Sequence, residues 1–171
     1  MNINKLLRSI FKIVAAYKGK LTLMSKEDFM LTPPIGGWSY SEVYVHIFDS
    51  SLLSLIALQN CVNGNGTAAP TSFGTKAVLF FGMLPPGKKY KVPKKLADRV
   101  KKIDKITAEK FISDFEGQLS VIDARIDKVD GTIKVLHPRL GYLNAKQWLR
   151  FIEIHLNHHL KQLGRIEKSF L

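Results

Sequence analysis

Apolar residues recur every three or four positions over long stretches of the chain, which is the spacing of amphipathic α-helices. The first stretch runs over residues 3–23. The second begins at Ser39, because Ser39 and Glu42 form the pattern of an N-terminal capping box. Asn144 and Gln147 repeat that pattern before the last apolar stretch. We therefore predict three long helices at these positions.

A fourth long helix is predicted between the second and the last. It begins at Thr107 and ends at Asp130-Gly131, and its inner seam has the spacing of bundle packing: Phe111, Phe115, Leu119, Ile122 and Ile126. A shorter helix over residues 72–83 is apolar on most sides, so we expect it to be heavily buried. Ser25 with Asp28 predicts the cap of one extra helical turn.

The segments between these helices predict turns and one extended stretch. Residues 32–37 and 137–141 are rich in proline and glycine, which end helices. Residues 132–136 are short and β-branched, so they favour an extended segment, but no other part of the sequence offers them a convincing strand partner. A basic connection around Pro93–Val100 has room for one helical turn.

This order of elements predicts an all-α fold, namely a four-helix bundle in a single domain over residues 1–171. The length suffices for one sizeable core. The basic segment between the short helix and the fourth long helix is long enough to act as a crossover connection.

Two histidines interrupt the inward stripe of the last helix. His155 and His159 stand four positions apart, so both rings can reach one point beside the helix. This is how a helix offers two nitrogen ligands to a metal ion, and a pair of core histidines without metal is the alternative. His46 lies on the core face of the second helix. A bundle could bring it opposite the pair, which would give three imidazoles and one open coordination position, as in a catalytic zinc site.

Several other side chains are candidates for smaller roles. Asp49 follows His46 by three positions and is our candidate second-shell carboxylate or base, with a solvated aspartate as the alternative. Gln162 either orients water or substrate or holds a helix contact. His137 either shapes its turn or contacts substrate. We expect His158 at the surface or an interface, Trp38 and Trp148 in the core, and Cys61 as a buried small side chain.

The formal net charge is +12, and seven of these excess charges lie between Pro85 and Lys105. Such a run, with prolines and glycine in it, is typical of a solvated connection, and no nucleic-acid-binding motif accompanies it. An anionic substrate or membrane surface could still be attracted there. No uninterrupted apolar run has the length of a membrane span, and Lys12 breaks the apolar N-terminal region that would otherwise resemble a signal peptide. The single cysteine agrees with a reducing compartment, and we expect a cytoplasmic protein. From the character of the basic run and the lack of a membrane-spanning run, we expect that it binds neither nucleic acid nor membrane.

Two motifs together carry a resemblance to a known family. Residues 37–42 (GWSYSE) followed by His46, and Trp148 followed by residues 155–162 (HLNHHLKQ), resemble the DinB/YfiT-like superfamily of metal-binding bundles. Residues 137–162 resemble one uncharacterised bacterial branch of it. The resemblance spans most of the chain, from about Trp38 to Gln162, and the basic Lys88–Lys105 segment does not match the family.

The resemblance implies an up-down-down-up connection, a divalent metal ion (zinc, nickel or iron) held by His46, His155 and His159, and often a homodimer. Characterised members of this superfamily include thiol-dependent S-transferases and isomerases and metal-dependent hydrolases. It therefore implies first the transfer of a low-molecular-weight thiol to a small-molecule substrate and second hydrolysis. The alternatives are a non-catalytic metal-binding or stress-response protein and, third, a nucleic-acid-binding protein that uses the basic segment.

Overall fold

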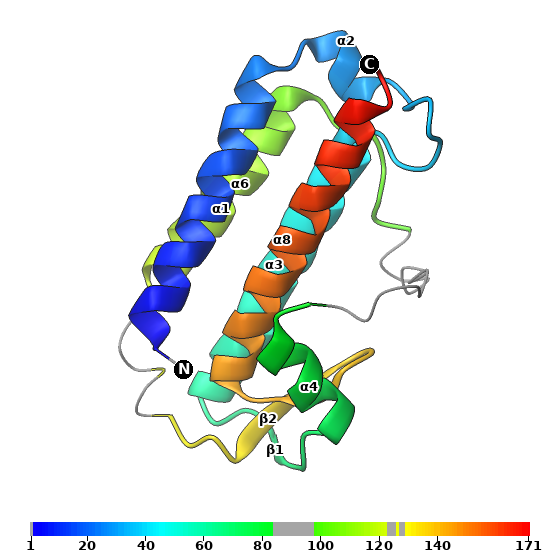
Figure 1. Cartoon of the computed structure of the whole chain (residues 1–171). Coiled ribbons are helices and arrows are strands. Elements are labelled where there is room, and N and C mark those ends of the chain that lie inside the picture. The colour runs from blue at the N-terminus through cyan, green and yellow to red at the C-terminus, as the bar shows by residue number, and fades with distance from the viewer. Residues whose placement is uncertain (1, 84–97, 123–125, 127–128) are drawn as a thin grey trace.

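The computed structural model describes residues 2–83, 98–122, 126 and 129–171, and over these residues the protein is mainly helical (Figure 1). Its long helices are α1 (Ile3–Leu23), α3 (Tyr40–Val62), α6 (Lys105–Ser120) and α8 (Ala145–Lys168). Helices α1 and α8 run in one direction along the bundle, and α3 and α6 run in the other (Figure 1). The predicted all-α four-helix bundle with up-down-down-up order is therefore confirmed.

Helix α3 forms the centre of the bundle. It packs most extensively against α8 and α6, and α1 packs against α8 and, less extensively, against α6. The length and mean hydropathy (1.3) of α3 would allow it to cross a membrane, but 61% of the apolar window is buried inside the protein. A helix that packs on several sides needs apolar residues around most of its circumference. Its composition is thus that of the core helix of a bundle.

Two buried tyrosines connect three of the helices by hydrogen bonds. The Tyr17 hydroxyl of α1 donates to the Leu156 carbonyl of α8 at 2.8 Å. The Tyr44 hydroxyl of α3 donates to the Tyr17 carbonyl at 2.7 Å. Their rings also pack edge to face, with centroids 5.5 Å apart. These contacts fix the relative height of α1, α3 and α8, and therefore the height at which residues of α3 face those of α8.

We expect Tyr17→Phe to lower the free energy of unfolding by about 1 kcal/mol, because it removes one buried hydrogen bond and keeps the ring. Urea denaturation measures this change. Tyr40→Phe is the matched control, since Tyr40 is buried but no described residue hydrogen-bonds its hydroxyl. Equal effects of the two substitutions would show that the Tyr17 bond does not stabilise the bundle.

The two short helices begin where the sequence predicts. Helix α2 (Lys26–Met30) has Ser25 as its N-cap, and α4 (Phe73–Phe81) has Ser72. The prediction that α4 is heavily buried is wrong, because only Thr75 and Leu79 are buried. Its three phenylalanines, Phe73, Phe80 and Phe81, are 86%, 81% and 69% exposed. The helix has fewer than three turns and lies across one end of the bundle, so it buries one narrow face against α8 (Figure 1).

The predicted extended segment has strand partners, which corrects the sequence analysis. Strand β2 (Ile133–His137) lies between β1 (Thr67–Ala68) and β3 (Gly141–Leu143), and both pairings are antiparallel. The partner strands have two and three residues. Such segments are too short to show the alternation by which strands are recognised. The predicted turn at residues 137–141 joins β2 to β3.

Helix α6 begins two residues before the predicted start, because Asp104 rather than a later residue caps it and accepts from the Thr107 backbone N–H. It ends at Ser120, where the Ile122 N–H donates to the Leu119 carbonyl three residues back. Such a tighter bond closes an α-helix. The helix does not continue unbroken to residue 130, although Ile122 and Ile126 are buried as predicted. Residues 123–125 and 127–128, and most of the basic segment with its predicted helical turn, lie outside the described residues.

Candidate metal centre

Three histidines from two antiparallel helices converge in the bundle. His46 comes from α3, and His155 and His159 come from successive turns of α8. One ring nitrogen from each lies within 4.8 Å of the other two. The Nε2 atoms of His155 and His159 are 3.1 Å apart. The structure therefore brings together the three residues that the sequence singles out, although His46 is more than a hundred positions away from the other two.

The spacing of the two α8 donors is that of two zinc ligands, and a ring nitrogen of His46 lies within 4.8 Å of both. Two nitrogens about 2.0–2.1 Å from a tetrahedral zinc ion would be about 3.3 Å apart, close to the distance between the two α8 imidazoles. The His159 Nδ1 atom lies 2.7 Å from the Gln162 carbonyl oxygen, Oε1. An amide oxygen can only accept, so Nδ1 carries the proton and the lone pair of His159 is on Nε2. Gln162 thus leaves the Nε2 lone pair of His159 directed into the cluster, and second-shell partners of metal-binding histidines make the same kind of hydrogen bond.

Burial keeps these imidazoles neutral. It lowers the pKa of His46 to about 4, and the nearby Asp49 carboxylate opposes this shift only in part. Burial, followed by the charges of neighbouring histidines, holds the pKa values of His155 and His159 well below the ordinary value. A metal ligand must be deprotonated. The three rings are therefore in the protonation state that binds a metal ion at neutral pH.

Comparison with solved structures finds YfiT from Bacillus subtilis, described as a probable metal-dependent hydrolase with an unusual four-helix bundle topology. The match covers 98% of this chain and 86% of that one, with a TM-score of 0.63. This chain has the YfiT-like four-helix bundle fold. The two sequences are 14% identical, so the likeness is one of fold. No protein-family model and no curated protein sequence matches the chain.

In this YfiT-like bundle, aromatic rings enclose the histidines along the direction of α8. Trp38, just before α3, lies 4.9 Å from His46 and 6.5 Å from His159 between ring centroids. On the other side, the Phe151 ring stacks on His155 at 5.2 Å. The sequence predicted Trp38 only as a core anchor. Its position directly before the N-cap of the helix that carries His46 was the available signal of its contact with the site.

Asp49 is held by an arginine that lies fifty positions further along the chain. The Arg99 Nε and Nη2 atoms donate to its two carboxylate oxygens at 2.7 and 2.5 Å. Asp49 raises the pKa of His46 through its charge, but no hydrogen bond joins the two side chains in the described structure. Its assignment as a catalytic residue therefore stays a prediction. Arg99 is a neighbour of the site that sequence analysis missed, because nothing local connects the two positions.

The other singled-out residues have smaller roles. His158 is half-buried, and its ring lies 5.0 Å from that of His159. Trp148 is buried in the core as predicted. Cys61 is also buried, and its burial raises the pKa of its thiol, which does not favour a nucleophile.

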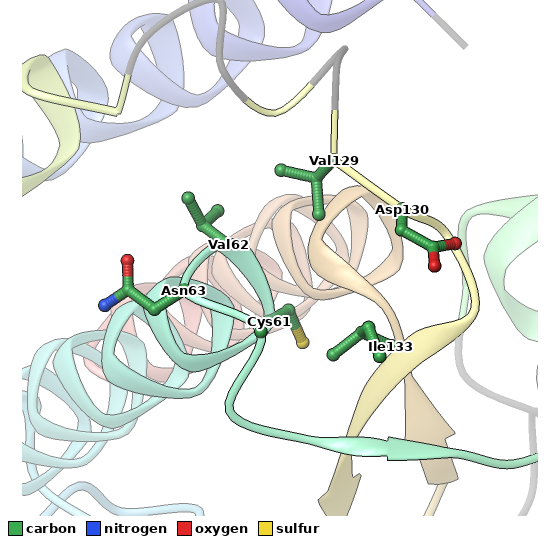
Figure 2. Close-up of a pocket in the computed structure, with 7 residues that line it drawn as sticks. Cys61, Val62, Asn63, Val129, Asp130 and Ile133 are labelled. Atoms are coloured by element: carbon green, nitrogen blue, oxygen red, sulfur yellow. The ribbon is translucent and has the colours of Figure 1, made fainter.

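A cavity of about 390 Å³ lies away from the histidines. It is lined by residues 61–64 at the end of α3 and by Val129, Asp130 and Ile133, and the Cys61 sulfur points toward Ile133 (Figure 2). Cys61 follows His46 by fifteen positions on the same helix, or about 22 Å. The cavity is therefore separate from the candidate metal centre.

Proposed function

We propose that this protein is a metal-dependent hydrolase that acts on a small-molecule substrate, with one divalent ion held by His46, His155 and His159. The convergence of three neutral ring nitrogens within 4.8 Å of one another carries this proposal. The description of the YfiT neighbour supports the same class of reaction. Imidazole ligands suit zinc, nickel or iron. Three protein ligands leave a coordination position for a reactant, which distinguishes a catalytic from a structural site.

The ion, when bound, would supply Lewis acidity, which lowers the pKa of a neighbouring water and polarises a carbonyl group. The protein's own residues prepare the place for that chemistry. Gln162 keeps the His159 lone pair on Nε2 through its hydrogen bond to Nδ1. Trp38 covers the rings on one side and Phe151 on the other, and such apolar neighbours strengthen electrostatic interactions inside the site.

Asp49 lies near the cluster, and its carboxylate is paired with Arg99. Both carboxylate oxygens accept hydrogen bonds from the guanidinium group. A carboxylate in such a bidentate pair has both oxygens engaged by the guanidinium group. We therefore propose that Asp49 acts mainly through its negative charge, by supporting the positive charge that His46 would share with a bound ion. A role in proton transfer would require Arg99 to move.

The description of the YfiT neighbour favours hydrolysis over the thiol transfer that the family resemblance places first. Both reactions would use the same three histidines and the same open position, so the substrate decides between them. The homodimer and the cytoplasmic location implied by the sequence stay predictions. The predicted lack of nucleic-acid and membrane binding also stays a prediction.

The test measures hydrolysis by the full chain loaded with zinc, nickel or iron(II). A panel of chromogenic esters, anilides and phosphate esters is assayed with and without glutathione. We expect metal-dependent release of product without thiol, and loss of that activity in His155→Ala. Release that requires glutathione would instead support thiol transfer. Stoichiometric metal binding without turnover of any substrate would support the non-catalytic metal-binding protein.

A further inference from the structure

His137 has a ring nitrogen that accepts two backbone hydrogen bonds. It ends β2, and its Nδ1 atom accepts from the Arg139 N–H at 3.1 Å and the Leu140 N–H at 3.0 Å. A nitrogen that accepts two such bonds carries a lone pair, so the proton of the neutral imidazole is on Nε2. Burial lowers the pKa of His137 to about 4, and hence the ring is neutral at pH 7. The turn therefore fixes His137 as a neutral Nε2–H donor.

The ring of Phe151 connects this donor to the histidine cluster, because it contacts both His137 and His155. The His137 centroid is 4.5 Å from that of Phe151, and Phe151 stacks on His155 with a centroid distance of 5.2 Å. Of the three cluster histidines, His46 and His159 are buried, whereas part of His155 reaches solvent. His155 is thus the partly exposed member of the cluster, and Phe151 and His137 lie on its side.

The Nε2–H group of His137 has no hydrogen-bond partner among the described residues. Among the described residues, three buried side-chain atoms have no hydrogen-bond partner: Ser51 Oγ, Trp148 Nε1 and His155 Nδ1. The Nε2 atom of His137 is not one of these buried atoms. The group is therefore open to solvent and available to a ligand. Trp148, whose ring centroid is 5.2 Å from that of His137, has its unpaired N–H fully buried, so the accessible donor on this side is His137.

We infer that His137 binds the substrate by donating its Nε2–H to a carbonyl oxygen of a small molecule held at the histidine cluster. This inference rests on the proposed function and names a specificity-determining residue for it. A neutral donor selects an acceptor oxygen without requiring a negative charge. The substrate class is therefore an ester or amide, whose carbonyl is also the group that a hydrolase must orient.

Two substitutions separate this role from a purely structural one. In His137→Asn, the side-chain oxygen can accept the two backbone N–H groups in the Asx-turn manner, but the distant donor is lost. In His137→Ala, both the acceptor and the donor are lost. The first variant is thus expected to keep the turn, and the second to weaken it.

The test uses the cobalt-loaded full chain, whose visible spectrum reports ligands at the ion. The probes are acetohydroxamate, which carries a carbonyl, and chloride, which has no second acceptor atom. We expect His137→Asn to bind acetohydroxamate about tenfold more weakly than wild type, with unchanged affinity for chloride and cobalt and a thermal midpoint closer to wild type than that of His137→Ala. We expect His137→Ala to lose acetohydroxamate affinity equally and to unfold at a lower temperature.

Other results would overturn the inference. Wild-type affinity for acetohydroxamate in His137→Asn, with only a lower thermal midpoint in His137→Ala, would show that His137 serves the turn alone. A nitrogen-15 NMR spectrum of the metal-free protein with the proton on Nδ1 would contradict the assigned donor. Failure of the wild type to bind cobalt would remove the proposed function itself, and that result is distinct from the other two.

Discussion

Replacing His159 with alanine is expected to abolish the binding of one divalent ion per chain at micromolar protein concentration. His159 is the ligand whose lone pair is fixed by Gln162, and it lies closest to a second ligand atom, His155 Nε2. Loss of a second-shell partner typically weakens metal binding 10–100-fold, so loss of the ligand itself should weaken it by more than about 100-fold. Isothermal titration with zinc and elemental analysis of dialysed protein measure the effect.

His158→Ala is the matched control, because it removes the adjacent imidazole from the same helix. His158 lies beside His159 but is not among the three residues whose nitrogens converge. The control variant should bind one ion with wild-type affinity. Equal loss in both variants would indicate damage to α8 rather than removal of a ligand, and retention of a full equivalent of zinc by His159→Ala would exclude His159 as a ligand.

The metal-free protein is expected to lose stability steeply as the pH falls from 6.5 toward 4. Burial lowers the pKa values of His46 and His137 to about 4 and those of His155 and His159 well below the ordinary 6.5. Between pH 6.5 and 4, the unfolded chain binds protons that the folded protein does not, so the free energy of unfolding falls. Each buried histidine contributes up to about 1.4 kcal/mol per pH unit in this window.

Urea denaturation at pH 8.5, 7.5, 6.0 and 5.0 measures this dependence. The midpoint should be unchanged between pH 7.5 and 8.5, where neither state takes up protons at histidine, and it should fall from pH 6.0 to 5.0. His46→Gln, which replaces one titrating ring by a neutral amide, should show a shallower fall. A midpoint that is the same at pH 7.5 and 5.0 would mean that the imidazoles are not held neutral by burial.

The helices could be predicted because their signals are local. Ser39 and Glu42, and likewise Asn144 and Gln147, form the capping boxes that the sequence pattern predicts, with all bonds within four residues. The four-residue spacing of His155 and His159 likewise determines that they share a helix face. Convergence with His46 could be predicted once a bundle was assumed, because α3 and α8 are then packed partners.

The features that sequence analysis missed depend on contacts between distant segments. The exposure of α4 depends on how many faces the rest of the bundle covers, and its apolar composition does not contain that information. Strand β1 has two residues, and only its pairing with β2, some sixty-five positions away, makes it a strand. The Asp49–Arg99 pair and the contact of Trp38 with His159 are of the same kind, because each joins residues far apart in the sequence.

X-ray absorption spectroscopy of the zinc-loaded protein tests the central claim most directly, because it reports the number and type of ligands at the ion. We predict one zinc ion per chain with three imidazole nitrogens at about 2.0–2.1 Å and one further light ligand. A protein that binds less than a tenth of an equivalent of zinc, or an ion whose ligands include fewer than three imidazoles, would contradict the assignment of His46, His155 and His159 as a metal centre.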